Sequence, residues 1–186
     1  MKLGKTLQVT TREAWRKWLE KNYDKEPEIW LVYSKQHTGK ARVPYGEAVE
    51  EALCFGWIDS TVKTIDENSF AQRFSPRRSK SPWSASNIER MKRLKKLRLM
   101  TPAGLAAFKG TKQGKLNIAP DVLEALKEDQ EVWQNFQKFP EGYKRIRIAY
   151  IESQRKHGPE AFARSLKNFL KKTKANKKFA FGGVQN

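Results

Sequence analysis

The chain has 186 residues, a single cysteine and a formal net charge of +18, from 38 basic against 20 acidic side chains. This length allows one domain or a domain with a smaller neighbour, and a hydrophobic content of 38% supports a folded core. The lone Cys54 excludes an internal disulfide and any multi-cysteine metal site. We find neither a signal peptide nor a run near the roughly 20 apolar residues of a membrane span, and therefore predict a cytoplasmic protein.

The positive charge is concentrated in the middle of the chain. Residues 1–67 carry equal numbers of acidic and basic side chains, whereas residues 68–120 carry thirteen basic residues against Glu89 alone. Residues 121–186 hold a smaller excess, fourteen against eight. Regional positive charge attracts polyanions such as nucleic acid, anionic lipid headgroups or an acidic protein. The alternative is a solvated surface that keeps the protein in solution.

A helix followed by a buried strand is predicted at the start of the chain. Thr10 and Glu13 have the spacing of a capping box, and the apolar residues that follow share one face, which predicts a helix over 11–22. The continuous apolar run at 29–34 predicts a strand that is buried on both faces.

A second helix is expected to begin at Tyr45 and to end before Gly56, because its apolar residues share one face and glycine is a common helix stop. We expect the polar face to point to water; it carries Glu47, Glu50 and Glu51. Cys54 lies in the last turn, whereas a reactive thiol usually needs a helix N-terminus or a cationic neighbour. Cys54 is therefore predicted to be a core residue.

Residues 57–65 and 70–74 predict a β-hairpin, because both are rich in β-branched or alternating apolar residues and turn-forming residues separate them. Alternation would place one set of side chains on the same face: Trp57, Asp59, Thr61 and Lys63. Asp59 would then lie on a strand beside Arg73. Two interpretations follow: an Asp–Arg ion pair, or a carboxylate that acts as a general base or binds a ligand.

The next segment predicts an irregular loop and two helices. Prolines and serines interrupt residues 75–84, and Ser86 with Glu89 forms a second capping box that predicts a helix to about Met100. Thr101 and Pro102 predict the cap and first residue of another helix. The first of these helices has one sign of charge, from Arg90, Lys92, Arg93, Lys95, Lys96 and Arg98.

A group of hydroxyl, arginine and aromatic residues around this loop is the candidate binding site. Arginine forks and serine hydroxyls at a helix start can hold a phosphate or a carboxylate, because the free amides of the first turn add to them, and Trp83 could stack on a ligand. Alternatively, Asp59–arginine pairing pins the loop to the hairpin and Trp83 is its buried anchor. The group contains Asp59, Ser60, Arg73, Ser75, Arg77, Arg78, Ser81, Trp83, Ser84 and Asn87.

Beyond the polar residues 110–117, which form the expected linker, the pattern predicts helices alone. We predict an α+β protein: a small mixed sheet with helices at 1–112, an all-helical region at 118–175, and a frayed tail at 176–186. His37 and His157 lie in predicted turns without further metal-ligand motifs, and common catalytic signatures are absent. Binding is therefore favoured over catalysis, and we expect no metal or cofactor.

Several of these segments resemble the YdeI/OmpD-associated (OmdA-like, bacteriocin-protection) family. Residues 52–60, 73–78, 81–87 and 100–104 carry the resemblance, which covers residues 10–110 well. The helical end fits the family less closely, with Tyr150-Ile151-Glu152-Ser153 similar to an aromatic-Ile helix of its C-terminal domain. The resemblance implies a role in protection against bacteriocins or antimicrobial peptides and a periplasmic location, and it implies no catalytic residue.

Three functions are consistent with the sequence. The first is a stress-type binding protein whose basic helix holds an anionic partner, with nucleic acid as the leading candidate. The second is a small-anion pocket or an unrecognised enzyme, in which Arg73, Arg77 and Ser84 bind the anion and Asp59 acts as a base or orienting group. In the third, the polar group only folds the loop and the function resides in a protein partner.

Overall fold

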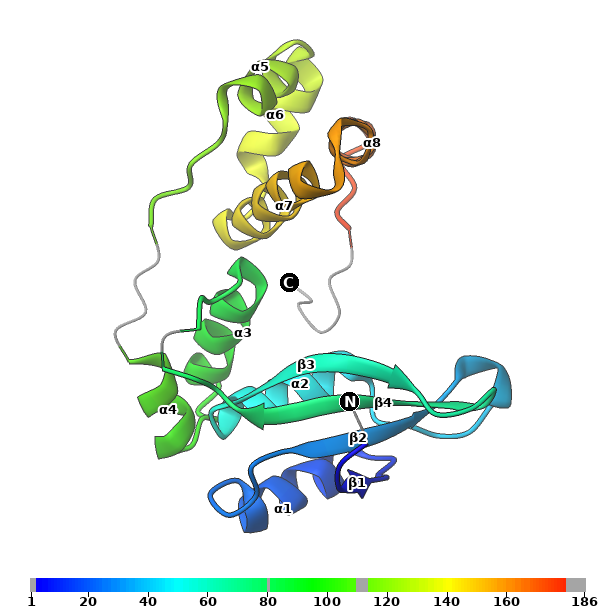
Figure 1. Ribbon diagram of the computed structural model, residues 1–186. Helices are drawn as coiled ribbons and strands as arrows, with labels where there is room; N and C mark the ends of the chain where they lie inside the picture. The colour runs from blue at the N-terminus through cyan, green and yellow to red at the C-terminus, as the bar shows by residue number, and fades with distance from the viewer. Residues whose placement is uncertain (1–2, 80, 110–113, 180–186) are drawn as a thin grey trace. The chain divides into compact units, whose positions relative to one another are not determined.

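The computed structural model describes residues 3–79, 81–109 and 114–179 (Figure 1). The chain forms two compact units, one of Met1–Trp83 with Arg90–Thr111 and one of Ser84–Glu89 with Lys112–Asn186. Parts of the predicted linker and tail, at 110–113 and 180–186, lie outside the described residues. Within the described part, we find no helix that is long and apolar enough to cross a membrane.

A four-stranded mixed sheet forms the centre of the first unit. Its strands are β1 (Thr6–Leu7), β2 (Ile29–Ser34), β3 (Trp57–Thr64) and β4 (Ser69–Pro76), in the order β1-β2-β4-β3. β1 is parallel to β2, and the other neighbours are antiparallel. The α+β class, the first predicted strand and the hairpin are confirmed. β1 was not predicted, because a two-residue strand has no periodicity to detect.

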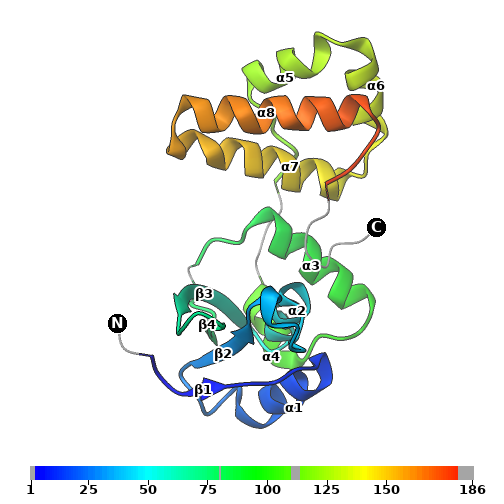
Figure 2. The same cartoon turned by 90° about the vertical axis from the view of Figure 1, so that its right-hand side faces the viewer.

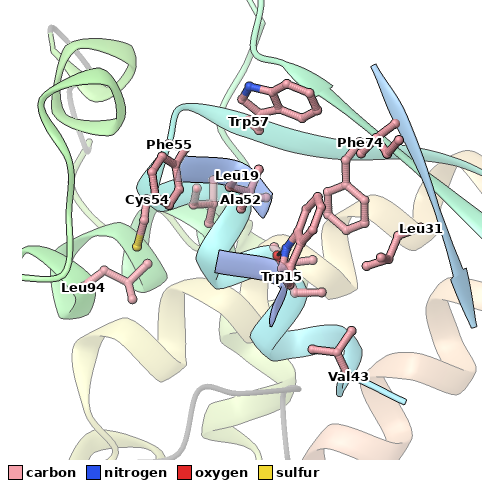
Figure 3. Packing of buried hydrophobic residues seen from close by; sticks show 14 of the residues in the cluster. Trp15, Leu19, Leu31, Val43, Ala52, Cys54, Phe55, Trp57, Phe74 and Leu94 are labelled. Carbon is pink, nitrogen blue, oxygen red and sulfur yellow. Dashed lines mark hydrogen bonds between the residues drawn. The ribbon is translucent and has the colours of Figure 1, made fainter. Parts of the chain in front are cut away.

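Two helices bury one face of the sheet, α1 (Arg12–Asn22) and α2 (Tyr45–Cys54). The Trp15 ring of α1 lies against Phe74 of the sheet, with centroids 5.4 Å apart (Figure 3). The Trp15 indole N–H donates to the carbonyl oxygen of Ala48 at 3.0 Å, so this fully buried side chain leaves no polar atom without a partner.

The cap of α1 differs from the predicted one by one residue. The side-chain oxygen of Thr11, not of Thr10, accepts a hydrogen bond from the backbone N–H of Ala14 at 3.2 Å. Glu13 therefore occupies the second helical position rather than the third, and the predicted capping box does not form.

The polar face of α2 turns inward, contrary to prediction. Glu50 and Glu51 are only 1% and 2% exposed. Glu51 pairs with Arg12 and Arg16, at 2.6 and 2.7 Å. Glu50 pairs with Arg93 and lies 3.5 Å from Arg12. The prediction was wrong because the arginines that compensate these buried charges come from other helices, which helical periodicity within α2 cannot reveal.

A β-bulge changes the predicted faces of the hairpin. Asp59 pairs with Phe74 and Val62 pairs with Gln72, so two residues of β3 oppose Arg73 alone. The extra residue reverses the alternation, and Val62 rather than Thr61 shares the face of Asp59. The predicted common face is therefore correct for Trp57 and Asp59 and wrong beyond the bulge.

Two helices follow the hairpin, α3 (Ala85–Lys96) and α4 (Pro102–Phe108). α3 is shorter than predicted, because Arg98 adopts a left-handed conformation with φ of 58° and turns the chain. α4 begins as predicted: the Thr101 side chain accepts from the backbone N–H of Gly104 at 3.3 Å.

The second unit is helical in its described residues, as predicted for this region, apart from short connecting segments. It contains α5 (Pro120–Lys127), α6 (Gln130–Lys138), α7 (Glu141–Ser153) and α8 (Pro159–Lys174), with a 3₁₀ turn at Gln154–His157 between the last two. α7 and α8 lie side by side (Figure 2). The buried core contains Val122, Leu126, Val132, Phe136, Phe139, Tyr143, Ile148, Ile151 and Phe169.

Candidate functional site

A tyrosine, not an arginine, holds Asp59. The Tyr45 hydroxyl, at the start of α2, donates to Asp59 Oδ2 at 2.6 Å. Asp59 lies opposite Phe74 in the ladder, so its neighbour Arg73 projects from the other face of the sheet. The predicted Asp59–Arg73 pair is therefore wrong. Burial, the hydrogen bond and the Asp59 charge raise the pKa of Tyr45, which keeps the phenol protonated as the donor.

Sequence reasoning missed a second tyrosine beside this pair. Tyr33 of β2 is 1% exposed, and its hydroxyl has no hydrogen-bond partner among the described residues. Burial raises its pKa, the charges of Tyr45 and Asp59 raise it further, and Arg42 acts in the opposite direction. Tyr33, Tyr45 and Asp59 come from β2, α2 and β3, so no local motif could have revealed that they lie together.

Arg73 lies on the opposite face of the sheet, where it pairs with Glu28. Its Nε donates to Glu28 Oε2 at 2.7 Å, and the Trp30 indole donates to Glu28 Oε1 at 3.0 Å. The hydrogen bonds from Arg73 and Trp30 hold the pKa of Glu28 below its usual value. Ser60 Oγ lies 3.4 Å from Arg73 Nη1, a contact between two residues of the predicted site.

Arg77 and Trp83 stabilise the loop itself. Arg77 donates to the carbonyl oxygens of Ser81, at 2.9 Å, and Pro82, and its guanidinium lies 3.8 Å from the centroid of the Trp83 ring. Burial lowers the pKa of Arg77. Trp83 packs edge-on against Phe108 of α4, with centroids 5.2 Å apart. Trp83 is partly buried rather than fully buried, and these contacts are compatible with the anchor role; the arginine of the loop bonds to backbone carbonyl groups rather than to Asp59.

The remaining predicted site residues are divided between a helix cap and the end of a strand. Ser84 Oγ accepts from the backbone N–H of Asn87 at 3.2 Å, so Ser84 rather than Ser86 caps α3. Ser75 pairs with Ile58 in the hairpin, and Arg78 is exposed just beyond it. The structure thus forms three small pairs, Arg73–Ser60, Arg77–Trp83 and Ser84–Asn87, and gives Asp59 a different partner.

The segments that carry the family resemblance, residues 52–60, 73–78, 81–87 and 100–104, are called here the family-like motif. Its first and last segments pack directly on each other. The carbonyl oxygen of Cys54, at the end of α2, accepts from Thr101 Oγ1 at 2.6 Å and from the Thr101 N–H at 3.1 Å. Gly56 has a φ of 76° and Gly104 lies over the same carbonyl group. These residue types in the motif are therefore explained by a close backbone contact between the end of α2 and the start of α4.

Cys54 is buried as predicted, and burial together with Glu51 raises its pKa to about 11.

We expect native Cys54 to react with iodoacetamide at pH 8 at least about a hundredfold more slowly than the unfolded chain. The thiolate is the nucleophile, and the raised pKa leaves less of it in the folded protein. The folded pKa is the higher one, so the thiol's contribution to stability is complete below about pH 8.5 and is lost as the pH rises towards 11. Mass spectrometry of alkylation with and without urea measures the difference, and equal rates would contradict it.

The basic helix α3 divides its cations between two environments. Arg90 is 8% exposed, and Arg93 forms the ion pair with Glu50, so both point towards the fold. The others are exposed and are called here the basic face of α3: Lys92, Lys95 and Lys96 of the helix, together with Arg98 just beyond its end. Charge patterning predicted a one-sign helix and could not separate these two groups. Among the described residues, no three potential ligands of the His, Cys, Asp and Glu types gather to hold a metal.

These features define a protein with a mixed-sheet unit, a helical unit and an exposed basic helix segment. Residues 7–107, more than half of the chain, match the model of a domain of unknown function, DUF8412, and the chain belongs to that family. Residues 115–176 match the OmdA family, described as Bacteriocin-protection, YdeI or OmpD-Associated. The resemblance is confirmed, although the OmdA match lies in the helical region rather than over residues 10–110. No curated protein and no solved structure gives a significant match.

Proposed function

We propose that this protein binds an anionic polymer, with nucleic acid as the first candidate, through the basic face of α3. The observation that carries the proposal is the exposure of these four cations, whereas Arg90 and Arg93 of the same helix are used inside the fold. Lys95, Lys96 and Arg98 form no ion pair within the described residues. Adjacent exposed cations on one short segment favour contact with successive phosphates.

The charge also bears on the description of the OmdA family as bacteriocin-protection proteins. An isoelectric point near 10.1 disfavours direct capture of cationic peptides, because like charges repel. Under this proposal, a protective role acts through an anionic partner in the cytoplasm.

The small-anion alternative has less support from the geometry. It requires Asp59, Arg73, Arg77 and Ser84 to converge on one ligand. Their hydrogen bonds instead connect them to Tyr45, Glu28, loop carbonyl groups and the start of α3. We therefore favour the polymer.

The test is binding of labelled duplex DNA and single-stranded RNA across a salt series. In B-DNA, each neutralised phosphate contributes about −0.9 to the slope of log K against log salt concentration. We expect a variant with Lys95→Glu, Lys96→Glu and Arg98→Glu to bind at least tenfold more weakly at low salt, on the order of 1 kcal/mol or more, and to have a slope reduced by up to about 3.

A matched control reverses three exposed lysines in and after α1, Lys17, Lys21 and Lys25, with the same change in net charge. This control should retain most of the affinity and the slope if the basic face is the site. Equal weakening by both variants would show that net charge alone attracts the polymer. Failure of the wild type to bind either polymer at low salt would overturn the proposal.

A further inference from the structure

A cavity of about 310 Å³ lies within the helical unit. The residues that line it include Arg147 and Tyr150 of α7, Arg164, Ser165 and Asn168 of α8, and Phe179. Its volume falls at the lower end of the roughly 300–1,000 Å³ that is usual for small-molecule sites. We call it the α7–α8 cavity.

The lining of the α7–α8 cavity is positively charged. Among the described residues, those that line it include two arginines and no aspartate or glutamate. Arg147 is 5% exposed, and burial lowers its pKa, but a guanidinium remains protonated in any accessible pH range. The cavity therefore presents a permanent positive charge in a partly buried setting, where an anion interacts more strongly than it would at an open surface.

Aromatic rings surround the Arg147 guanidinium. Its centre lies 4.0 Å from the Phe179 ring centroid and 4.8 Å from that of Tyr150. These contacts restrict the orientation of the arginine, which reduces the entropy that it would lose on binding a ligand. Tyr150 is also 46% exposed, so part of its side chain remains accessible.

Polar groups on α8 complement the arginines. Arg164 and Asn168 are four residues apart, a spacing that places two side chains on the same helical face. Ser165 lies between them, and its hydroxyl oxygen is buried without a hydrogen-bond partner among the described residues. Hydroxyl, amide and guanidinium donors together match the acceptor oxygens of a carboxylate or phosphate.

We propose that the α7–α8 cavity binds a small organic anion. Arg147 and Arg164 hold its carboxylate or phosphate group, Ser165 and Asn168 add hydrogen bonds, and its flat apolar part lies along Tyr150 and Phe179. This site belongs to the helical unit and uses none of the residues of the basic face of α3. It can therefore be tested independently of polymer binding.

The first test titrates the full-length protein with phenyl phosphate, benzoate, inorganic phosphate and benzyl alcohol by isothermal titration calorimetry. We expect saturable binding of phenyl phosphate or benzoate, and the stronger of the two identifies the preferred anionic group. Inorganic phosphate should bind at least about fivefold more weakly than phenyl phosphate, because it lacks the ring. Equal or tighter binding of neutral benzyl alcohol, or no saturable binding of either aromatic anion, would overturn the proposal.

A variant locates the site. Arg164→Gln should weaken binding of the aromatic anion by about tenfold or more, because a charge-assisted hydrogen bond is lost from an exposed position where folding is not at risk. Lys167→Gln makes the same charge change on α8 outside the cavity lining and should bind like the wild type. Equal affinities of wild type and Arg164→Gln, or equal weakening in both variants, would contradict the assignment. The α3 charge-reversal variant should retain wild-type anion affinity.

Discussion

Replacing Gly104 with alanine is expected to lower the free energy of unfolding by about 3 kcal/mol, the upper end of the usual range for overpacking. An added Cβ would lie 2.2 Å from the carbonyl oxygen of Cys54 and 2.6 Å from the end of Met100. The carbonyl group cannot easily retreat, because Thr101 donates two hydrogen bonds to it. In a helix, alanine is otherwise favoured over glycine by about 1 kcal/mol, so a loss of stability would identify the contact as its cause.

Urea denaturation followed by tryptophan fluorescence measures this effect. Gly114→Ala is the matched control, since an added Cβ there meets no atom within 4 Å. The control should change stability by less than about 0.5 kcal/mol. A Gly104→Ala variant as stable as the control would show that the α2–α4 junction is looser than described.

Replacing Glu51 with alanine is expected to cost about 3 kcal/mol of stability. Its carboxylate is 3% exposed and bonds to Arg12 and Arg16, so its removal leaves two guanidinium groups near each other without their shared anion. Both arginine side chains are about 30% exposed, which allows water to reach them and keeps the expected loss at the lower end for buried pairs.

The surface residue Glu20 provides the comparison for Glu51. It pairs with Arg16 one turn along α1 at 3.3 Å, but its side chain is 51% exposed. Glu20→Ala should cost less than about 0.5 kcal/mol, and high salt should remove most of that difference. Similar losses for Glu20→Ala and Glu51→Ala would mean that the buried network contributes no more than a surface pair.

The family-like motif has a clear structural role. Its first segment includes the end of α2. Its last segment begins α4 with Thr101, which caps that helix and donates a hydrogen bond to the Cys54 carbonyl oxygen at the end of α2. The loop that follows β4 is stabilised by the Arg77–Trp83 contact. Much of the motif therefore specifies how the first unit folds, and sites of partner binding are better sought among residues that the fold leaves exposed, such as the basic face of α3.

For the candidate site, local sequence patterns predicted some side-chain roles and missed others. Local chemistry offered two roles for Trp83, and its contacts with Arg77 and Phe108 are compatible with the anchor role. It placed the cap of α3 at Ser86, two residues too late, and this was wrong because Ser84 is the cap. It failed for Asp59, because the choice between Arg73 and Tyr45 depends on a bulge and on how α2 meets the sheet. One extra residue in β3 decides which side chains share a face, and neighbouring residues alone do not specify it.

The sequence by itself determined the α+β class, the hairpin, the helical second half and the regional positive charge, because periodicity, turn residues and charge are local properties. Only the tertiary structure decided that Glu50 and Glu51 are buried, that Arg90 and Arg93 point inward, and that arginines of α7 and α8 share one cavity. Burying a charge is unfavourable unless a partner compensates it, and here the partners lie between 35 and 43 residues away for the closest pairs. Such partners become visible when the helices that carry them are packed together.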